Sequence, residues 1–145
     1  MTSDLRQALA LLPHGLEFRF LDRLLHLEPG KNGVGEYLVR GDEPFLRGHF
    51  PGEPLFPGVL LVEGGAQLAG TVAQCDPALP PLPGLKLTAI SKMKILGSAR
   101  PQEVIRFEAD ITGRMANLIQ ASVRAYILDQ RVMEGEIILS GNLAQ

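Results

Sequence analysis

The second half of the chain alternates between apolar and polar positions in several separate runs. Residues 85–96, 103–112 and 116–128 read LKLTAISKMKIL, EVIRFEADIT and ANLIQASVRAYIL. Apolar and β-branched residues in partial alternation are typical of strands with one buried face. A turn at Asp129 and Gln130 then leads into RVMEGEIILSG, which predicts a hairpin.

The first half of the chain predicts shorter elements. Ser3 or Asp4 can cap a short helix that runs through Leu12. The following apolar segments at 17–31 and 33–42 predict two strands, with a Pro-Gly turn near the end of the first one.

The segment 57–74, PGVLLVEGGAQLAGTVAQ, predicts a longer helix. Pro57 suits its first turn, where a missing N–H is no loss. Apolar residues lie on every side, which is typical of a buried helix. The proline-rich loop at 75–84 ends the helix. One buried helix among long antiparallel strands predicts an α+β fold, with residues 1–145 forming a single domain.

Glu63 is an acidic residue inside this otherwise apolar helix. A buried carboxylate is strongly disfavoured unless it is paired, hydrogen-bonded or protonated. Gln67 follows one turn later on the same helix face, where its amide can hold the carboxyl group. A structural ion pair with an arginine explains Glu63 about as well as a functional acid does.

His49 comes shortly before the helix, in the stretch HFPGEPLFPG. The start of a helix offers unpaired N–H groups, here near Gly58 and Val59, which with the helix dipole favour a developing oxyanion. A base, an acid and an oxyanion site around an apolar helix suit proton transfer next to the carbonyl of an apolar substrate. The other two histidines, His14 and His26, are expected to be structural.

Composition narrows the class of function. The net charge of −2 gives no sign of nucleic-acid binding. Cys75 is the sole cysteine, so we expect no internal disulfide and a cytoplasmic location. The polar N-terminus lacks a signal-peptide pattern, and no run is apolar enough for a confident membrane span. No cluster of metal ligands is visible, so no metal is expected.

The stretch HFPGEPLFPGVLLVEGGAQ at 49–67 closely resembles the signature of FabZ-type 3-hydroxyacyl-[acyl-carrier-protein] dehydratases, HFPGxPxxPGVLxxEaxaQ. LPHGLEFRFLDRLLHLEPGK at 12–31 and GDEPFLRGHFPG at 41–52 resemble further motifs of that family. The resemblance covers residues 12–72. It implies the hotdog fold, in which an antiparallel sheet of about five to six strands wraps a long central helix.

The resemblance also implies roles for individual residues. His49 matches the catalytic histidine of the family, and Glu63 matches its catalytic acid. Gly58 matches the glycine whose amide binds the thioester carbonyl, Gln67 matches the glutamine beside the acid, and the pocket mouth is expected at Phe50 and Val59.

The implied activity is dehydration of (3R)-3-hydroxyacyl thioesters to trans-2-enoyl thioesters, in fatty acid or related polyene biosynthesis. The reaction needs no cofactor, and the partner is the acyl carrier protein that carries the substrate. A homodimer is implied, with a trimer of dimers as the larger alternative. In that family each site takes its histidine from one subunit and its acid from the other.

Departures from the family pattern leave substrate length and carrier docking open. Gly64 and Gly65 replace the family's alanine and methionine, and we expect them to widen the pocket. A hotdog acyl thioesterase and a non-catalytic acyl-binding protein are the alternative functions. Five basic residues could meet an acidic carrier, although solvated strand faces explain them equally well: Lys92, Lys94, Arg100, Arg106 and Arg114.

Overall fold

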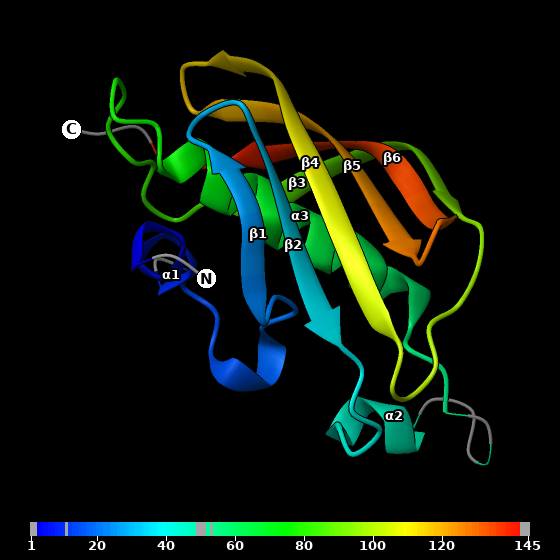
Figure 1. Ribbon diagram of the computed structural model, residues 1–145. Helices are drawn as coiled ribbons and strands as arrows, with labels where there is room; N and C mark the ends of the chain where they lie inside the picture. The colour runs from blue at the N-terminus through cyan, green and yellow to red at the C-terminus, as the bar shows by residue number, and fades with distance from the viewer. Residues whose placement is uncertain (1–2, 11, 49–51, 53, 143–145) are drawn as a thin grey trace.

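The computed structural model describes residues 3–10, 12–48, 52 and 54–142 of the chain. A curved sheet wraps one long helix, α3 (Gly58–Gln74), as Figure 1 shows. Three short helical elements lie at the margins of the sheet: α1 (Ser3–Ala10), η1 (Leu16–Phe18) and α2 (Pro44–Gly48). The strands are β1 (Arg23–Glu28), β2 (Asn32–Leu38), β3 (Lys86–Ile95), β4 (Val104–Met115), β5 (Leu118–Ile127) and β6 (Gln130–Ser140).

The six strands form one antiparallel sheet in the order β1-β2-β4-β5-β6-β3. Burial alternates along β2 and β5. In β5 the buried positions are apolar and Gln120, Ser122 and Arg124 lie outside, whereas in β2 the buried positions are Gly33, Gly35 and Tyr37. The predicted hairpin is confirmed, because β5 and β6 pair from Ile127 and Gln130 onward. The α+β architecture predicted from the apolar pattern is therefore the observed one.

Four aromatic side chains join the segments on either side of α2 to the core. The Phe56 ring lies 5.5 Å from that of Phe45 and 5.8 Å from that of Phe20, both in edge-to-face geometry. Tyr37 completes the cluster, at 5.9 Å from Phe20 and 5.7 Å from Phe56. These contacts fix the chain just before α3, because Phe56 precedes its N-cap residue, Pro57, by one position.

The expectation that Gly64 and Gly65 widen a pocket is wrong. A Cβ atom on Gly64 would lie 2.7 Å from Cε1 of Phe107, and one on Gly65 would lie 3.1 Å from Cβ of Val123. Both glycines therefore face the sheet, where they let the helix backbone approach β4 and β5 closely. The sequence pattern showed small residues but not the face of the helix on which they lie.

The apolar pattern of α3 predicts a helix that is buried on every side. The structure differs, because the start of the helix is exposed. Val59 is 75% exposed, and Ile95 and Leu96 beside the helix start are exposed as well. These residues lie near β3, which pairs on one side only and forms an edge of the sheet. The register of β3 shifts between Ser91 and Lys94, so a bulge interrupts this edge.

The short elements differ most from the sequence prediction. The first strand begins at Arg23 rather than near residue 17, because the chain forms η1 before it. Helix α2 is not expected from the sequence at all, since five residues are too few to show a helical period. No helix among the described residues is long and apolar enough to cross a membrane.

We expect Gly64→Ala to lower the free energy of unfolding by about 1–3 kcal/mol, because the added methyl group meets the fully buried Phe107 ring. Gly70→Ala is the matched control in the same helix. Its Cβ atom would lie 3.4 Å from Cδ2 of Leu85, an ordinary contact, so helix propensity should raise stability by up to about 1 kcal/mol. Urea unfolding at equal protein concentration measures both, and equal stability of Gly64→Ala and wild type would contradict the packing argument.

Candidate active site

Helix α3 begins without a side-chain cap. Its N-cap residue is Pro57, which makes no capping hydrogen bond through its side chain. The N–H groups of Gly58 and Val59 have no acceptor within the helix, and the helix dipole adds positive character there. A Cβ atom on Gly58 would lie 3.1 Å from Cγ2 of Ile95, so glycine lets β3 approach this point. The helix start can therefore donate hydrogen bonds to an oxygen that gains negative charge.

The side chain of Gln67 is 2% exposed and makes three hydrogen bonds. Its Oε1 accepts from the backbone N–H of Phe20 at 2.9 Å. Its Nε2 donates to the carbonyl of Phe18 at 2.8 Å and to Oε1 of Glu63 at 3.3 Å. Gln67 thus joins α3 to the segment around η1 and holds the neighbouring acid, as the sequence predicts for it.

The Glu63 carboxyl group lies at the edge of the core, with 21% of its side chain exposed. Its Oε1 lies 3.3 Å from Nε2 of His14, in addition to the bond from Gln67. No arginine of the described residues forms an ion pair with it. Sequence reasoning treated His14 as structural and missed this contact, although the LPHG segment that contains His14 lies in the second shared motif.

Glu63 and Gln67 open into a mostly apolar pocket of about 460 Å³ between α3 and β3. Ala66, Gly70 and Thr71 line it from the helix, and the lining also includes residues on both sides of the helix: Leu12, Pro13, His14, Leu85, Lys86, Leu87 and Leu139. The pocket can therefore hold an apolar group beside a carboxyl group in its wall.

Two of the residues that line the pocket, Gln74 and Leu82, are joined by paired hydrogen bonds. Gln74, at the end of α3, donates to the carbonyl of Leu82 at 2.8 Å and accepts from its N–H at 2.9 Å. Arg114 adds bonds to the carbonyls of Ala73 and Pro80, at 3.2 and 3.0 Å. The proline-rich loop is thereby fixed to the C-terminus of α3.

The structure does not bring all of the expected site residues together. His49 and Phe50 lie outside the described residues. Gly58 and Val59 lie at the helix start and are not among the residues that line the pocket, and Val59 is exposed. Within the described part of the chain, the pocket joins Glu63 and Gln67 to His14.

A buried carboxylate anchors the chain that leads toward His49. Glu43 accepts hydrogen bonds from the hydroxyl of Tyr37 at 2.6 Å and from the N–H groups of Arg40 and Gly41 at 3.0 and 2.7 Å. Burial raises the pKa of Glu43, but the bond from Tyr37 and those from the backbone outweigh it, so the pKa is lowered overall. Among the described residues, no three His, Cys, Asp or Glu side chains are arranged to hold a metal ion.

The fold and the pocket define a hotdog protein with an acid in the wall of a mostly apolar cavity. A chain of a dehydratase heterocomplex from Xenorhabdus doucetiae has the same fold, with a TM-score of 0.76 and 12% sequence identity over 90% of this chain and 88% of that one. The sequence profile of the FabA-like domain matches residues 12–136.

Curated relatives narrow the family further. A 3-hydroxyacyl-[acyl-carrier-protein] dehydratase FabZ from Chloroflexus aggregans is 35% identical over 139 residues, covering 94% of each chain. A second FabZ, from Ruminiclostridium cellulolyticum, is 39% identical over 128 residues, covering 88% of this chain and 89% of the relative. The chain belongs to the FabA-like family, among the FabZ-type dehydratases.

We expect Gln67→Met to lower the free energy of unfolding by about 2–4 kcal/mol, because it leaves the Phe20 N–H and the Phe18 carbonyl without partners. Gln120→Met, on the exposed side of β5, is the matched control and should change stability by less than about 0.5 kcal/mol. Chemical denaturation of both variants measures the difference. Equal stability of the two variants would show that the buried amide does not hold the two segments together.

Proposed function

We propose that this protein removes water from (3R)-3-hydroxyacyl thioesters on acyl carrier protein, giving trans-2-enoyl thioesters for fatty acid or related polyene biosynthesis. The observation that carries the proposal is the Glu63 carboxyl group, held by hydrogen bonds at the wall of an apolar pocket. Membership in the FabZ-type dehydratases supports the same reaction. The single cysteine, Cys75, supports a reducing, cytoplasmic setting.

Three groups carry out the reaction: a base, an acid and an oxyanion site. His49 takes the C2 proton of the substrate, and the electrons of that C–H bond form the C2–C3 double bond as the C3–O bond breaks. Glu63 gives a proton to the departing hydroxyl group, which leaves as water. The N–H of Gly58, at the uncapped start of α3, stabilises the negative charge that develops on the thioester oxygen. The family resemblance assigns the substrate entrance to Phe50 and Val59, and Val59 lies at the helix start rather than in the wall of the pocket.

The active enzyme is a homodimer, or a trimer of such dimers, in which His49 and Glu63 of one site come from different subunits. Two observations support this assembly. Strand β3 leaves one edge unpaired, and Val59, Ile90 and Ile95 expose apolar side chains on or near it. A second copy of the chain would cover this apolar surface, and closed dimers are the commonest assembly.

The carrier protein docks through basic residues of the set predicted from the sequence. Arg106 and Arg114 already have partners within the fold, because Arg106 pairs with Glu108 at 3.3 Å and Arg114 binds two backbone carbonyls. Lys92 lies 3.9 Å from Glu136, so Lys94 on β3 and Arg100 after it are the cations of the predicted set that support a role in docking an acidic carrier.

One assay separates this function from its alternatives. The protein is incubated with a 3-hydroxyacyl thioester, and both the enoyl thioester and free thiol are measured. Enoyl product without free thiol supports the dehydratase, whereas free thiol identifies a thioesterase. Neither product, with the acyl thioester still bound, would identify a non-catalytic acyl-binding protein.

We expect His49→Ala and Glu63→Gln each to lower the rate of dehydration by at least about 100-fold, the usual scale for a general acid or base. Steady-state kinetics of folded variants provide the measurement, with circular dichroism as the control for folding. Near-normal turnover by either variant would remove that residue from the mechanism.

Mixing variants tests whether subunits share a site. Folded His49→Ala and Glu63→Ala proteins are inactive alone, but after subunit exchange a mixed dimer contains one site with both residues. Random pairing makes about half of the dimers mixed, so activity should recover to about a quarter of wild type. Verified exchange without recovery would show that both residues come from one chain, while the dehydratase assignment would stand.

A further inference from the structure

We propose that His14 is a positioning residue for Glu63. Its Nε2–H holds Oε1 of the carboxyl group, so that Oε2 becomes the oxygen that carries and donates the proton. This inference rests on the proposed dehydration, in which Glu63 is the acid. It assigns a role to a histidine that the sequence pattern marks only as structural.

Two donors converge on the same oxygen of Glu63. His14 Nε2 and Gln67 Nε2 both lie 3.3 Å from Oε1. The described residues provide no hydrogen-bond partner for Oε2. A carboxyl group that accepts two N–H bonds on one oxygen keeps its own proton on the other oxygen, because that proton would otherwise oppose the donors. Oε2 is therefore the oxygen available to a departing hydroxyl group in the pocket.

The environment of the imidazole ring fixes the tautomer that this role needs. Nδ1 of His14 is buried and has no hydrogen-bond partner among the described residues. Nδ1 lacks such a partner in either tautomer, so its burial does not choose between them. The contact at Nε2 does: a proton on Nε2 donates to Oε1 of Glu63, whereas a proton on Nδ1 would leave the Nε2 lone pair facing an oxygen that already accepts from Gln67.

The chain around His14 is held from two sides. Arg19 donates through Nη2 to the carbonyl of His14 at 3.3 Å and to that of Leu12 at 3.4 Å. The bonds of Gln67 to Phe18 and Phe20 fix the following residues to α3. The imidazole is thus placed by the backbone on both sides of it, which suits a group that orients another side chain.

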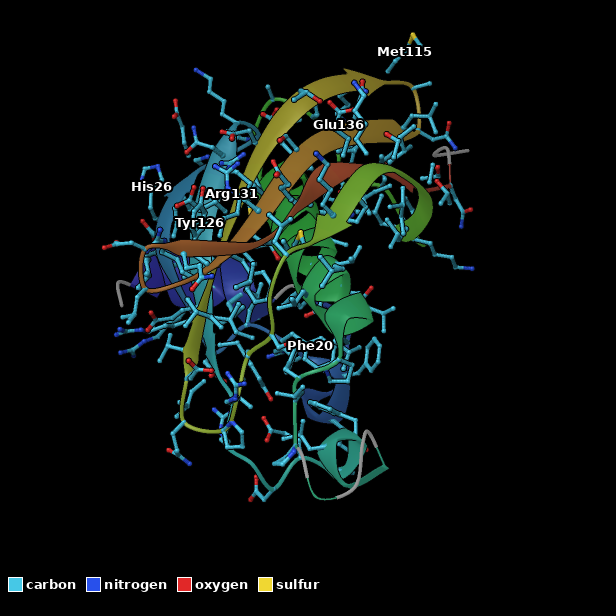
Figure 2. All side chains as sticks on the ribbon, turned by 90° about the vertical axis from the view of Figure 1, so that its right-hand side faces the viewer. Phe20, His26, Met115, Tyr126, Arg131 and Glu136 are labelled. Atoms are coloured by element: carbon cyan, nitrogen blue, oxygen red, sulfur yellow. The ribbon has the colours of Figure 1, made fainter. Side chains whose placement is uncertain are left out.

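His26 provides a matched control within the same chain. It is exposed on β1, where its Nε2 lies 2.9 Å from Oδ1 of Asn32. Figure 2 shows it at the margin of the sheet, away from α3. Replacing His26 therefore makes the same chemical change without touching Glu63.

The test compares His14→Gln with His14→Met. Glutamine can place an N–H near the position of Nε2, whereas methionine has a similar length and no donor. We expect His14→Met to lower kcat at least about tenfold, because the acid loses its orientation, with KM changed by less than about threefold. His14→Gln should keep kcat within about threefold of wild type, and His26→Met should match wild type.

Other results overturn the proposal. Wild-type kcat in His14→Met shows that the contact does not serve the reaction. An equal loss of kcat in both His14 variants shows that His14 does not act as a hydrogen-bond donor to Glu63. Thermal unfolding then separates the two remaining roles, because a lower melting temperature indicates a role in stability and an unchanged one indicates that His14 transfers a proton itself. If the wild-type protein forms no enoyl product, the proposed function is wrong, and the role of His14 falls with it. If only the His14 variants give an unexpected result, the role of His14 is wrong and the proposed function stands.

A measurement on the wild-type protein tests the role of His14 even if a His14 variant does not fold. The chain has three histidines, so nitrogen NMR of labelled imidazoles can resolve each ring. We expect the His14 signals to report a proton on Nε2 at neutral pH and to shift in Glu63→Gln. A neutral His14 ring with its proton on Nδ1 would overturn the proposal, because Nε2 could not then donate to the acid.

Discussion

The amide of Gln67 satisfies three groups at once, and the arrangement of the site follows from that. It pairs with the backbone on both sides of residue 19 and donates to Glu63 from within the core. Because the amide is buried, losing any partner would leave a polar group without a hydrogen bond. The acid and the segment that contributes His14 are therefore placed by the same side chain, although more than 40 residues separate them in sequence.

Helix α3 meets two opposing demands. Its sheet-facing side must approach β4 and β5 closely, which Gly64 and Gly65 permit. Its other side must leave room for an apolar group, and there Ala66, Gly70 and Thr71 line the pocket. Small residues therefore occur on both sides of the helix for different reasons, one for packing and one for space. This division explains why composition alone does not reveal which glycine affects the pocket.

Much of the fold could be predicted from the sequence because the signals are long. The boundaries of α3 follow from Pro57 and the proline-rich loop, and the strands of the second half follow from alternation over about ten residues each. Helix α2 and η1 are too short to show a period, so tertiary contacts decide them. Within the site, Glu63 and Gln67 stand out as polar residues in an apolar helix. His14 does not, because its partner lies 49 positions away and no local pattern marks the pair.

The bulge in β3 has a consequence for aggregation. An unpaired edge strand with exposed apolar residues such as Ile90 is a template for indefinite strand addition, the first step of amyloid-like aggregation. The register shift between Ser91 and Lys94, with Lys92 in a left-handed conformation at φ 53°, interrupts regular pairing there. Only short stretches on either side remain straight enough to pair. The folded chain can thus keep an open edge while resisting growth into a fibril.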